Sequence, residues 1–102
     1  MGRCGVALGA FVDEWWAAHA HPGLESSTLH VYRHVWERHA RSRLGGLAIT
    51  EVTPLTIAGF RATLEDDGVG AESIRETLRM LRSVFQRAVE RELIRSNPVR
   101  AV

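Results

Sequence analysis

The sequence predicts an all-α protein, a compact four-helix bundle, and three observations support this prediction. Four segments carry apolar residues at helical spacing, and Pro, Gly or Asn residues separate one segment from the next. The connections between these segments are short, as in helix bundles. At 102 residues the chain has the length of one domain. No apolar run approaches the roughly 18–20 residues that a membrane span requires.

The first predicted helix covers about residues 8–20. Two pairs of apolar residues lie four positions apart, Phe11 with Trp15 and Val12 with Trp16, and they form one stripe. A Pro-Gly dipeptide then ends the helix. Because two tryptophans are adjacent, we expect one of them to point away from the centre of the bundle and to cover a helix edge or meet another domain.

The second predicted helix begins after a Ser-Ser-Thr sequence, whose hydroxyl side chains are good N-caps, and runs to about Leu44. A Gly-Gly pair follows it and stops it. The connector over residues 47–53 looks briefly extended. We interpret it as a packed loop, because a lone strand would have nothing to pair with.

The third predicted helix opens with Thr53 as its cap and Pro54 at its first position, and it ends before Gly68. The fourth helix, about residues 71–94, has the strongest periodic pattern in the chain. An Asn-Pro pair ends it, since the residue before proline avoids the α-helical conformation. We therefore expect a disordered tail over residues 1–7, a domain over 8–96 and the start of a linker over 97–102.

The net charge of +1 hides an uneven distribution of charged residues. Segments 27–46 and 71–102 are net positive, whereas segments 1–26 and 47–70 are net negative. Such asymmetry indicates a charged partner and says nothing about the fold. The single cysteine, Cys4, cannot form an internal disulfide, which fits a reducing cytoplasm.

Four polar residues of the fourth helix form the main candidate site, because they are spaced four, three and four apart and so share one face. They are Arg75, Arg79, Arg82 and Gln86. Like charges at this spacing destabilise an isolated helix, and an anionic partner would remove that penalty. Arginines on a helix can contact phosphates or reach base edges in the DNA major groove. The alternative is a solvated face with Glu72 and Glu76 as local partners.

The start of the second helix forms another candidate, with Ser27, Thr28 and Arg33. A helix N-terminus presents free N–H groups and a partial positive charge, which suits a phosphate. The alternative is that Ser27 or Thr28 is only a cap. Arg41 and Arg43 are either peripheral phosphate contacts or solvated charges.

Other chemistries find little support in the residues. His30 and His34 have a spacing that can bind zinc, but further ligands would have to come close by chance, so we expect no metal and no cofactor. The tryptophans could stack on bases but fit a core better. No nucleophile–base pair or carboxylate pair stands out, which disfavours an enzyme.

Taken in order, several short motifs resemble the core-binding domain of phage integrases, which are tyrosine recombinases. They are Thr28 and Tyr32, His39, Leu44-Gly45, the step Leu47, Ile49 and Thr50, then Phe60 and Leu64, the apolar series Ile74, Leu78, Leu81, Phe85 and Ala88, and finally Asn97-Pro98. The resemblance covers roughly residues 8–98. Each motif alone is weak, and their order and spacing make the match specific.

The resemblance implies a SAM-like helical domain that clamps duplex DNA while a separate catalytic domain closes the other face. In this family the catalytic domain supplies the tyrosine nucleophile, so Tyr32 is not expected to be catalytic. We therefore expect a non-catalytic piece of a recombinase that serves DNA integration or recombination. Its partners would be double-stranded DNA, the catalytic domain of the parent chain and other integrase protomers. If the second and fourth helices do not share a face, the recombinase interpretation of the surface that they carry fails. The alternative is a helical protein-interaction module that binds an acidic partner.

Overall fold

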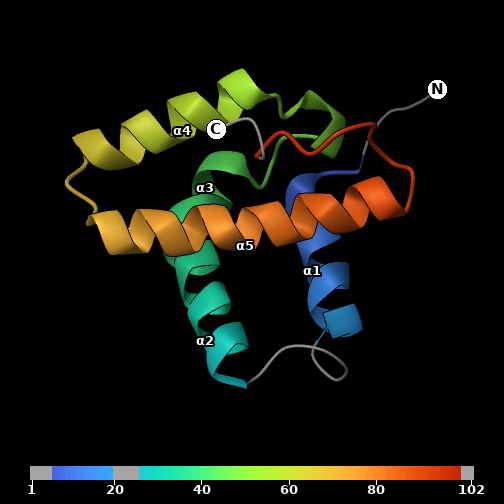
Figure 1. Ribbon diagram of the computed structural model, residues 1–102, viewed down its shortest axis with the longest axis horizontal. Helices are drawn as coiled ribbons and strands as arrows, with labels where there is room; N and C mark the ends of the chain where they lie inside the picture. Colours follow the sequence, from blue (N-terminus) through green and yellow to red (C-terminus); the bar gives the residue numbers. More distant parts are fainter. Residues whose placement is uncertain (1–5, 20–25, 100–102) are drawn as a thin grey trace.

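The computed structural model describes residues 6–19 and 26–99 (Figure 1). Its helices are α1 (Leu8–His19), α2 (Ser26–Val35), a π-helical turn (Trp36–Ala40), α3 (Arg41–Leu44), a 3-10 turn (Ile49–Glu51), α4 (Pro54–Asp66) and α5 (Ala71–Glu90). Because α2, the π-helical turn and α3 follow one another without a break, the described residues form four helical segments and no strand. The predicted all-α, four-helix fold is confirmed.

Helix α5 is the central element of the domain (Figure 1). It contacts α1, α2, the π-helical turn and α4. Helices α1 and α2 lie on one side of α5, whereas α4 lies on the other side and runs back along it. The strong amphipathic pattern of α5 explains this position, since its buried face must serve several neighbours at once.

Both tryptophans of α1 are buried, with Trp15 2% and Trp16 7% exposed. Their rings meet edge to face, with centroids 5.0 Å apart. Trp16 lies where α1 meets α2, and the guanidinium carbon of Arg33 sits 4.6 Å from its ring centroid. One tryptophan was expected to point away from the centre of the bundle and cover a helix edge, and Trp16 is the more exposed of the two. Trp16 is at the edge of the core, and a charged side chain from α2 covers it.

The π-helical turn interrupts the helix that the sequence predicted to run unbroken to Leu44. The backbone N–H of Arg41 bonds to the carbonyl oxygen of Trp36, five residues earlier, and so the turn holds one extra residue. Trp36, His39 and Ala40 are all buried in it. Burial lowers the pKa of His39 below its ordinary value of 6.5, and the charges of neighbouring Arg38, Arg43 and His34 lower this pKa further.

The connector after α3 does find a pairing partner, contrary to the prediction. Ala48 forms an isolated antiparallel bridge with Ala7. On either side of it, the N–H of Leu8 donates to the carbonyl of Leu47 at 2.7 Å, and the N–H of Ile49 donates to that of Val6 at 2.8 Å. Val6, which we assigned to the N-terminal tail, therefore accepts a hydrogen bond from the connector, and Ala7 is paired with it in the bridge. Residues 1–5 of that predicted tail lie outside the described residues.

Helices α4 and α5 end in the same backbone conformation. After α4, Gly68 has a φ of 80°, and the N–H of Val69 bonds to the carbonyl of Leu64 at 3.0 Å. After α5, Glu92 has a φ of 61°, and the N–H of Leu93 bonds to the carbonyl of Ala88 at 2.9 Å. Both are Schellman C-caps, in which a left-handed residue satisfies the last carbonyls. Helix α5 therefore ends four residues before the predicted end at Ile94.

The start of α4 follows the prediction closely. The hydroxyl of Thr53 accepts a bond from the N–H of Thr56 at 3.1 Å, and Pro54 occupies the first turn. At the other end of the chain, residues 97–99 pack onto α5, although we expected a linker to begin there. Asn97 is 6% exposed and Val99 is 5% exposed, and so this segment contributes to the core.

Candidate nucleic-acid interface

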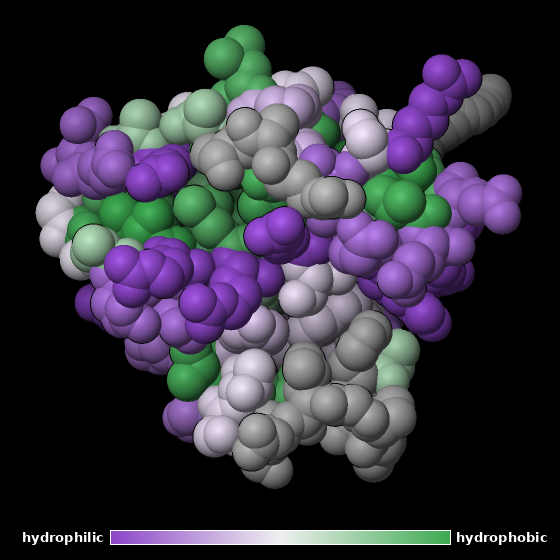
Figure 2. Space-filling view, viewed as in Figure 1, coloured by the Kyte–Doolittle hydropathy of each residue, from purple (hydrophilic) through white to green (hydrophobic). Residues whose placement is uncertain are grey.

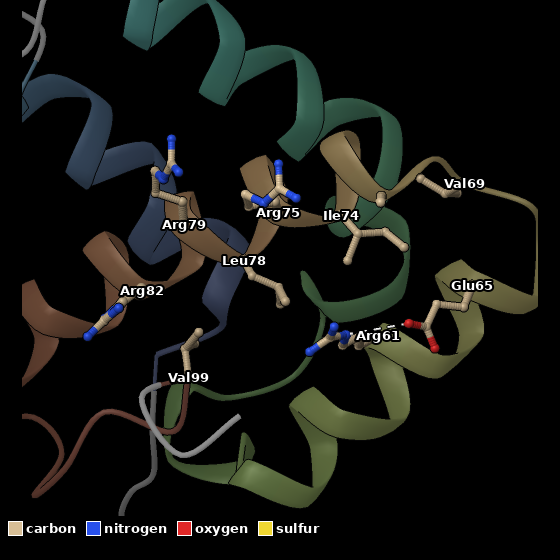
Figure 3. A pocket seen from close by; sticks show the side chains of 10 residues that line it. Arg61, Glu65, Val69, Ile74, Arg75, Leu78, Arg79, Arg82 and Val99 are labelled. Carbon is tan, nitrogen blue, oxygen red and sulfur yellow. Dashed lines mark ion pairs between the residues drawn. The ribbon is translucent and has the colours of Figure 1, made fainter.

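The predicted arginine stripe lies on the exposed side of α5. The side chains of Arg75 and Arg79 are 59% and 56% exposed, and Arg82 is exposed as well. All three line one groove between α4 and α5 (Figure 3). Gln86, the fourth member of the predicted stripe, is half-buried one turn further along and does not line the groove. The structure thus brings three of the four predicted α5 residues together.

The ion pairs within the stripe are local and exposed. Arg75 pairs with Glu72, and Arg79 lies 3.5 Å from Glu76, each pair three residues apart on α5. Exposed pairs of this kind contribute about 0–1 kcal/mol, so they hold the guanidinium groups only weakly. Within the described part of the chain, Arg82 has neither an ion pair nor a side-chain hydrogen bond. These guanidinium groups can therefore turn to an external anion at little cost.

Arg61 on α4 faces the stripe across the groove (Figure 3). Sequence reasoning missed this residue because it lies in the net-negative segment 47–70, four residues before Glu65. The two side chains form an ion pair at 3.5 Å, and both line the groove. The short turn between α4 and α5 folds the two helices side by side. This turn places Arg61 beside arginines that follow it by 14 to 21 positions in the sequence.

The groove has a volume of about 510 Å³ and an uneven lining. Four arginines and one carboxylate, that of Glu65, make up its charged groups. Apolar side chains complete the lining, namely Val69, Ala71, Ile74, Leu78 and Val99. Clustered charges of one sign beside low-dielectric walls focus the electrostatic potential and attract ions of the opposite sign. The geometry therefore favours an anionic ligand.

The predicted residues of α2 lie apart from this groove. Ser27 is exposed and Thr28 half-buried in the first turn of α2. Arg33 lines a second depression, together with His30, His34, Glu37 and Arg38. Helices α2 and α5 pack against each other, but Arg33 and the α5 stripe line different depressions. The sequence pattern did not indicate that Arg33 also stacks on Trp16.

Arg41 and Arg43 have partners in the fold. Arg41 pairs with Glu37 at 2.9 Å on the surface. Arg43 bonds to the carboxylate of Asp67 at 2.6 Å and to the carbonyl of His39 at 2.9 Å, and so it joins α3 to the end of α4. Among the described residues, no three His, Cys, Asp or Glu side chains gather closely enough to hold a metal ion. None of the helices described is long and apolar enough to span a bilayer.

Comparison with known proteins agrees with the observed fold. Residues 7–64 match the family described as the phage integrase N-terminal SAM-like domain. The integrase-like domain from Bacillus cereus superimposes with a TM-score of 0.85 at 20% identity, over 97% of this chain and 83% of that one. The phage integrase SAM-like domain from Moorella thermoacetica gives a TM-score of 0.81 at 22% identity, over 100% of this chain and 87% of that one.

At these identities the solved structures establish the fold alone. Comparison with curated protein sequences gives no significant match. The family match covers more than half of the chain, and the fold agrees with it. This chain therefore belongs to the family of phage integrase N-terminal SAM-like domains.

Proposed function

We propose that this domain binds duplex DNA as the core-binding module of a phage-type integrase, a tyrosine recombinase, and that it is not catalytic by itself. The observation that carries the proposal is the convergence of Arg61 with Arg75, Arg79 and Arg82 at one groove. Because the chain belongs to an integrase domain family, DNA is the anionic ligand that we propose for this groove. In this role the domain positions DNA for integration or recombination, and a separate catalytic domain supplies the chemistry.

The guanidinium groups of α5 would act mainly on the DNA backbone. Phosphate contacts provide most of the affinity of a protein for DNA and fix its register on the duplex. An arginine can also form two parallel hydrogen bonds to a guanine edge where a helix enters the major groove. Arg82 is the best placed of the stripe to bind first, since it has no competing acidic partner among the described residues. Gln86 would extend the contact by one turn.

The residues of α2 would provide a second, separate contact. The N-terminal turn of α2 holds Ser27 and Thr28, whose hydroxyls and backbone N–H groups suit a phosphate. Arg33 would add a charge beside Arg38 in the second depression. This second contact requires that one duplex reach both depressions, which lie on two helices that pack against each other. The catalytic domain of the parent chain and other integrase protomers would bind alongside, in the bacterial cytoplasm.

Fluorescence anisotropy with a labelled random-sequence duplex tests the proposal. Binding is measured over a series of salt concentrations for the wild type, for the double variant Arg75→Ala/Arg79→Ala and for Arg87→Ala. Arg87 is the matched control, because it lies on α5 and pairs with Glu90 at 3.8 Å but does not line the groove. Circular dichroism confirms that each variant is folded.

We expect the affinity of the wild type to fall as salt rises. The double variant should bind more weakly and with a shallower salt dependence, by up to about 0.9 in the log–log slope for each lost phosphate contact. Arg87→Ala should behave as the wild type does. Equal losses in the double variant and the control would show that the groove is not the DNA contact. No binding even at low salt, both for this domain and for the full-length parent protein, would overturn the proposal.

A further inference from the structure

The apolar floor of the α4–α5 groove is not explained by phosphate binding. Ile74, Leu78 and Val99 lie between the arginines of the two helices, and Leu78 points into the groove (Figure 3). Val69 lies at the end of the groove, where the turn joins α4 to α5. On the molecular surface, hydrophobic side chains form a strip between hydrophilic ones over α4 and over α5 (Figure 2). A phosphate gains nothing from apolar side chains, and it would lose water against them. The floor therefore fits a ligand that is itself partly apolar.

The charges around the floor restrict the chemistry of that ligand. The lining holds four guanidinium groups against the single carboxylate of Glu65, which already pairs with Arg61. A matching ligand would present an apolar side chain to Leu78 and Ile74, with carboxylates on either side of it. Carboxylates form paired hydrogen bonds with arginine in a fixed geometry. This combination describes an acidic amphipathic segment of a protein.

The shape of the groove favours a helix as the ligand. Helices α4 and α5 run back along each other and are joined by a short turn (Figure 1). Residues of both helices line the groove, and so the helices are its two walls. An amphipathic helix commonly lays its apolar face into a trough of this kind, with anchors four residues apart. A volume of about 510 Å³ has room for such anchors.

We propose that the α4–α5 groove docks an acidic amphipathic helix of a partner protein, with an apolar side chain against Leu78 and carboxylates on Arg61, Arg79 and Arg82. This helix covers the guanidinium groups proposed above to contact DNA. Partner and DNA therefore exclude each other, and the partner acts as an inhibitor of DNA binding. The proposed docking is argued only from the shape and lining of the groove. The mutual exclusion of partner and DNA rests, in addition, on the proposed function.

A fluorescein-labelled peptide of about 14 residues, roughly four helical turns, serves as the probe. It carries leucines at positions i and i+4 and glutamates at most other positions. A second peptide has the same composition, but its leucines are spread over all faces. Both are titrated with the wild type and with three variants, Leu78→Ser, Ala71→Gln and Arg87→Ala. Ala71 is exposed and lines the groove, and so its substitution fills the groove without disturbing the core.

We expect the amphipathic peptide to bind the wild type at least about tenfold more tightly than its rearranged counterpart, a difference of about 1.4 kcal/mol. Leu78→Ser and Ala71→Gln should each weaken the binding of the amphipathic peptide about tenfold or more. Arg87→Ala should leave this binding unchanged. Unlabelled duplex should displace the peptide from the wild type.

Two results would overturn the docking. The first is that both peptides bind alike, or not at all. The second is that Leu78→Ser and Ala71→Gln bind the peptide as the wild type does. If Leu78→Ser instead weakens duplex binding alone, the floor contacts thymine methyl groups and the protein partner is rejected. A wild type that binds the peptide through Leu78 but binds no DNA would retain the docking and remove the proposed function. A wild type that binds DNA but not the peptide would retain the proposed function and remove the docking.

Discussion

The side-chain amide of Asn97 donates a hydrogen bond to the backbone carbonyl of Arg82 at 2.9 Å. The other end of the same amide accepts a bond from the N–H of Val99 at 3.0 Å. Asn97 is buried, so these bonds are made away from water. One side chain thus holds the C-terminal segment against the helix that carries the arginine stripe.

Replacing Asn97 by alanine should destabilise the domain. The change leaves the N–H of Val99 without its partner, and such a loss costs about 1–3 kcal/mol for a buried group. The carbonyl of Arg82 loses one of two bonds, because it still accepts its helical hydrogen bond within α5. Urea unfolding followed by circular dichroism measures the difference. The neighbouring Ser96 is exposed, so Ser96→Ala is the matched control and should be neutral. Equal stability of Asn97→Ala and the wild type would contradict the role assigned to this amide.

Because both Schellman C-caps favour glycine, a substitution that introduces glycine and one that removes it should change stability in opposite directions. Glu92 adopts a left-handed conformation, which costs roughly 1 kcal/mol for a residue with a Cβ atom, so Glu92→Gly should raise the free energy of unfolding by somewhat less than this amount. Gly68→Ala should lower it by about 1 kcal/mol, because alanine resists a φ of 80°. Thermal unfolding of the two variants measures both changes. Shifts of the same sign would show that the backbone conformation does not control stability at these ends.

Arg33 should contribute to folding independently of any DNA contact. Its guanidinium group lies over the ring of Trp16, and an exposed cation–π contact is worth about 0.5–1 kcal/mol. Arg33→Ala should lower the free energy of unfolding by about this amount. Arg38→Ala is the matched control from the same depression, and it should leave stability unchanged. If both variants unfold at the same urea concentration as the wild type, the contact with Trp16 contributes nothing.

Buried His39 should make the domain less stable in acid. Its pKa in the folded state is lowered, so between that value and the ordinary 6.5 the unfolded chain binds a proton that the folded chain does not. This contribution to stability is complete above pH 6.5 and is lost as the pH falls through 6.5 towards the lower pKa of the folded state. Urea midpoints from about pH 8 to about pH 5 should therefore decrease.

The variant His39→Gln tests the origin of that decrease, because glutamine does not titrate. Its urea midpoint should depend less on pH over the same range. His30→Gln is the control, since His30 is exposed on the same continuous helical segment, and it should keep the dependence of the wild type. An unchanged dependence in His39→Gln would assign the acid sensitivity to other groups.

Local sequence signals predicted the helices well, because the causes of a helix are themselves local. The cap at Thr53 and the proline after it begin α4 as expected. Four of the five periodic apolar residues of α5, all but the half-buried Leu78, became part of its buried face. The arginines of the predicted stripe remained exposed. These features depend on residues within a few positions of each other.

The features that the sequence did not predict depend on residues far apart in the chain. The bridge between Ala7 and Ala48 needs the fold to bring its two segments together. Arg61 becomes part of the groove only when α4 folds back on α5. The π-helical turn fits Trp36 and His39 into the core, and nothing in the helical spacing of that segment requires an extra residue. Each of these three features is determined by tertiary packing.

The anchoring of Val99 in the groove has a consequence for any polypeptide joined after it. Val99 lines the groove, and any segment tethered to it by a short linker would be present at the groove at an effective concentration on the order of millimolar. Even a weak affinity for the groove would then be sufficient for an attached segment to occupy it. A tethered acidic segment would compete with DNA from within the same molecule, and the length of the tether would set the strength of that competition.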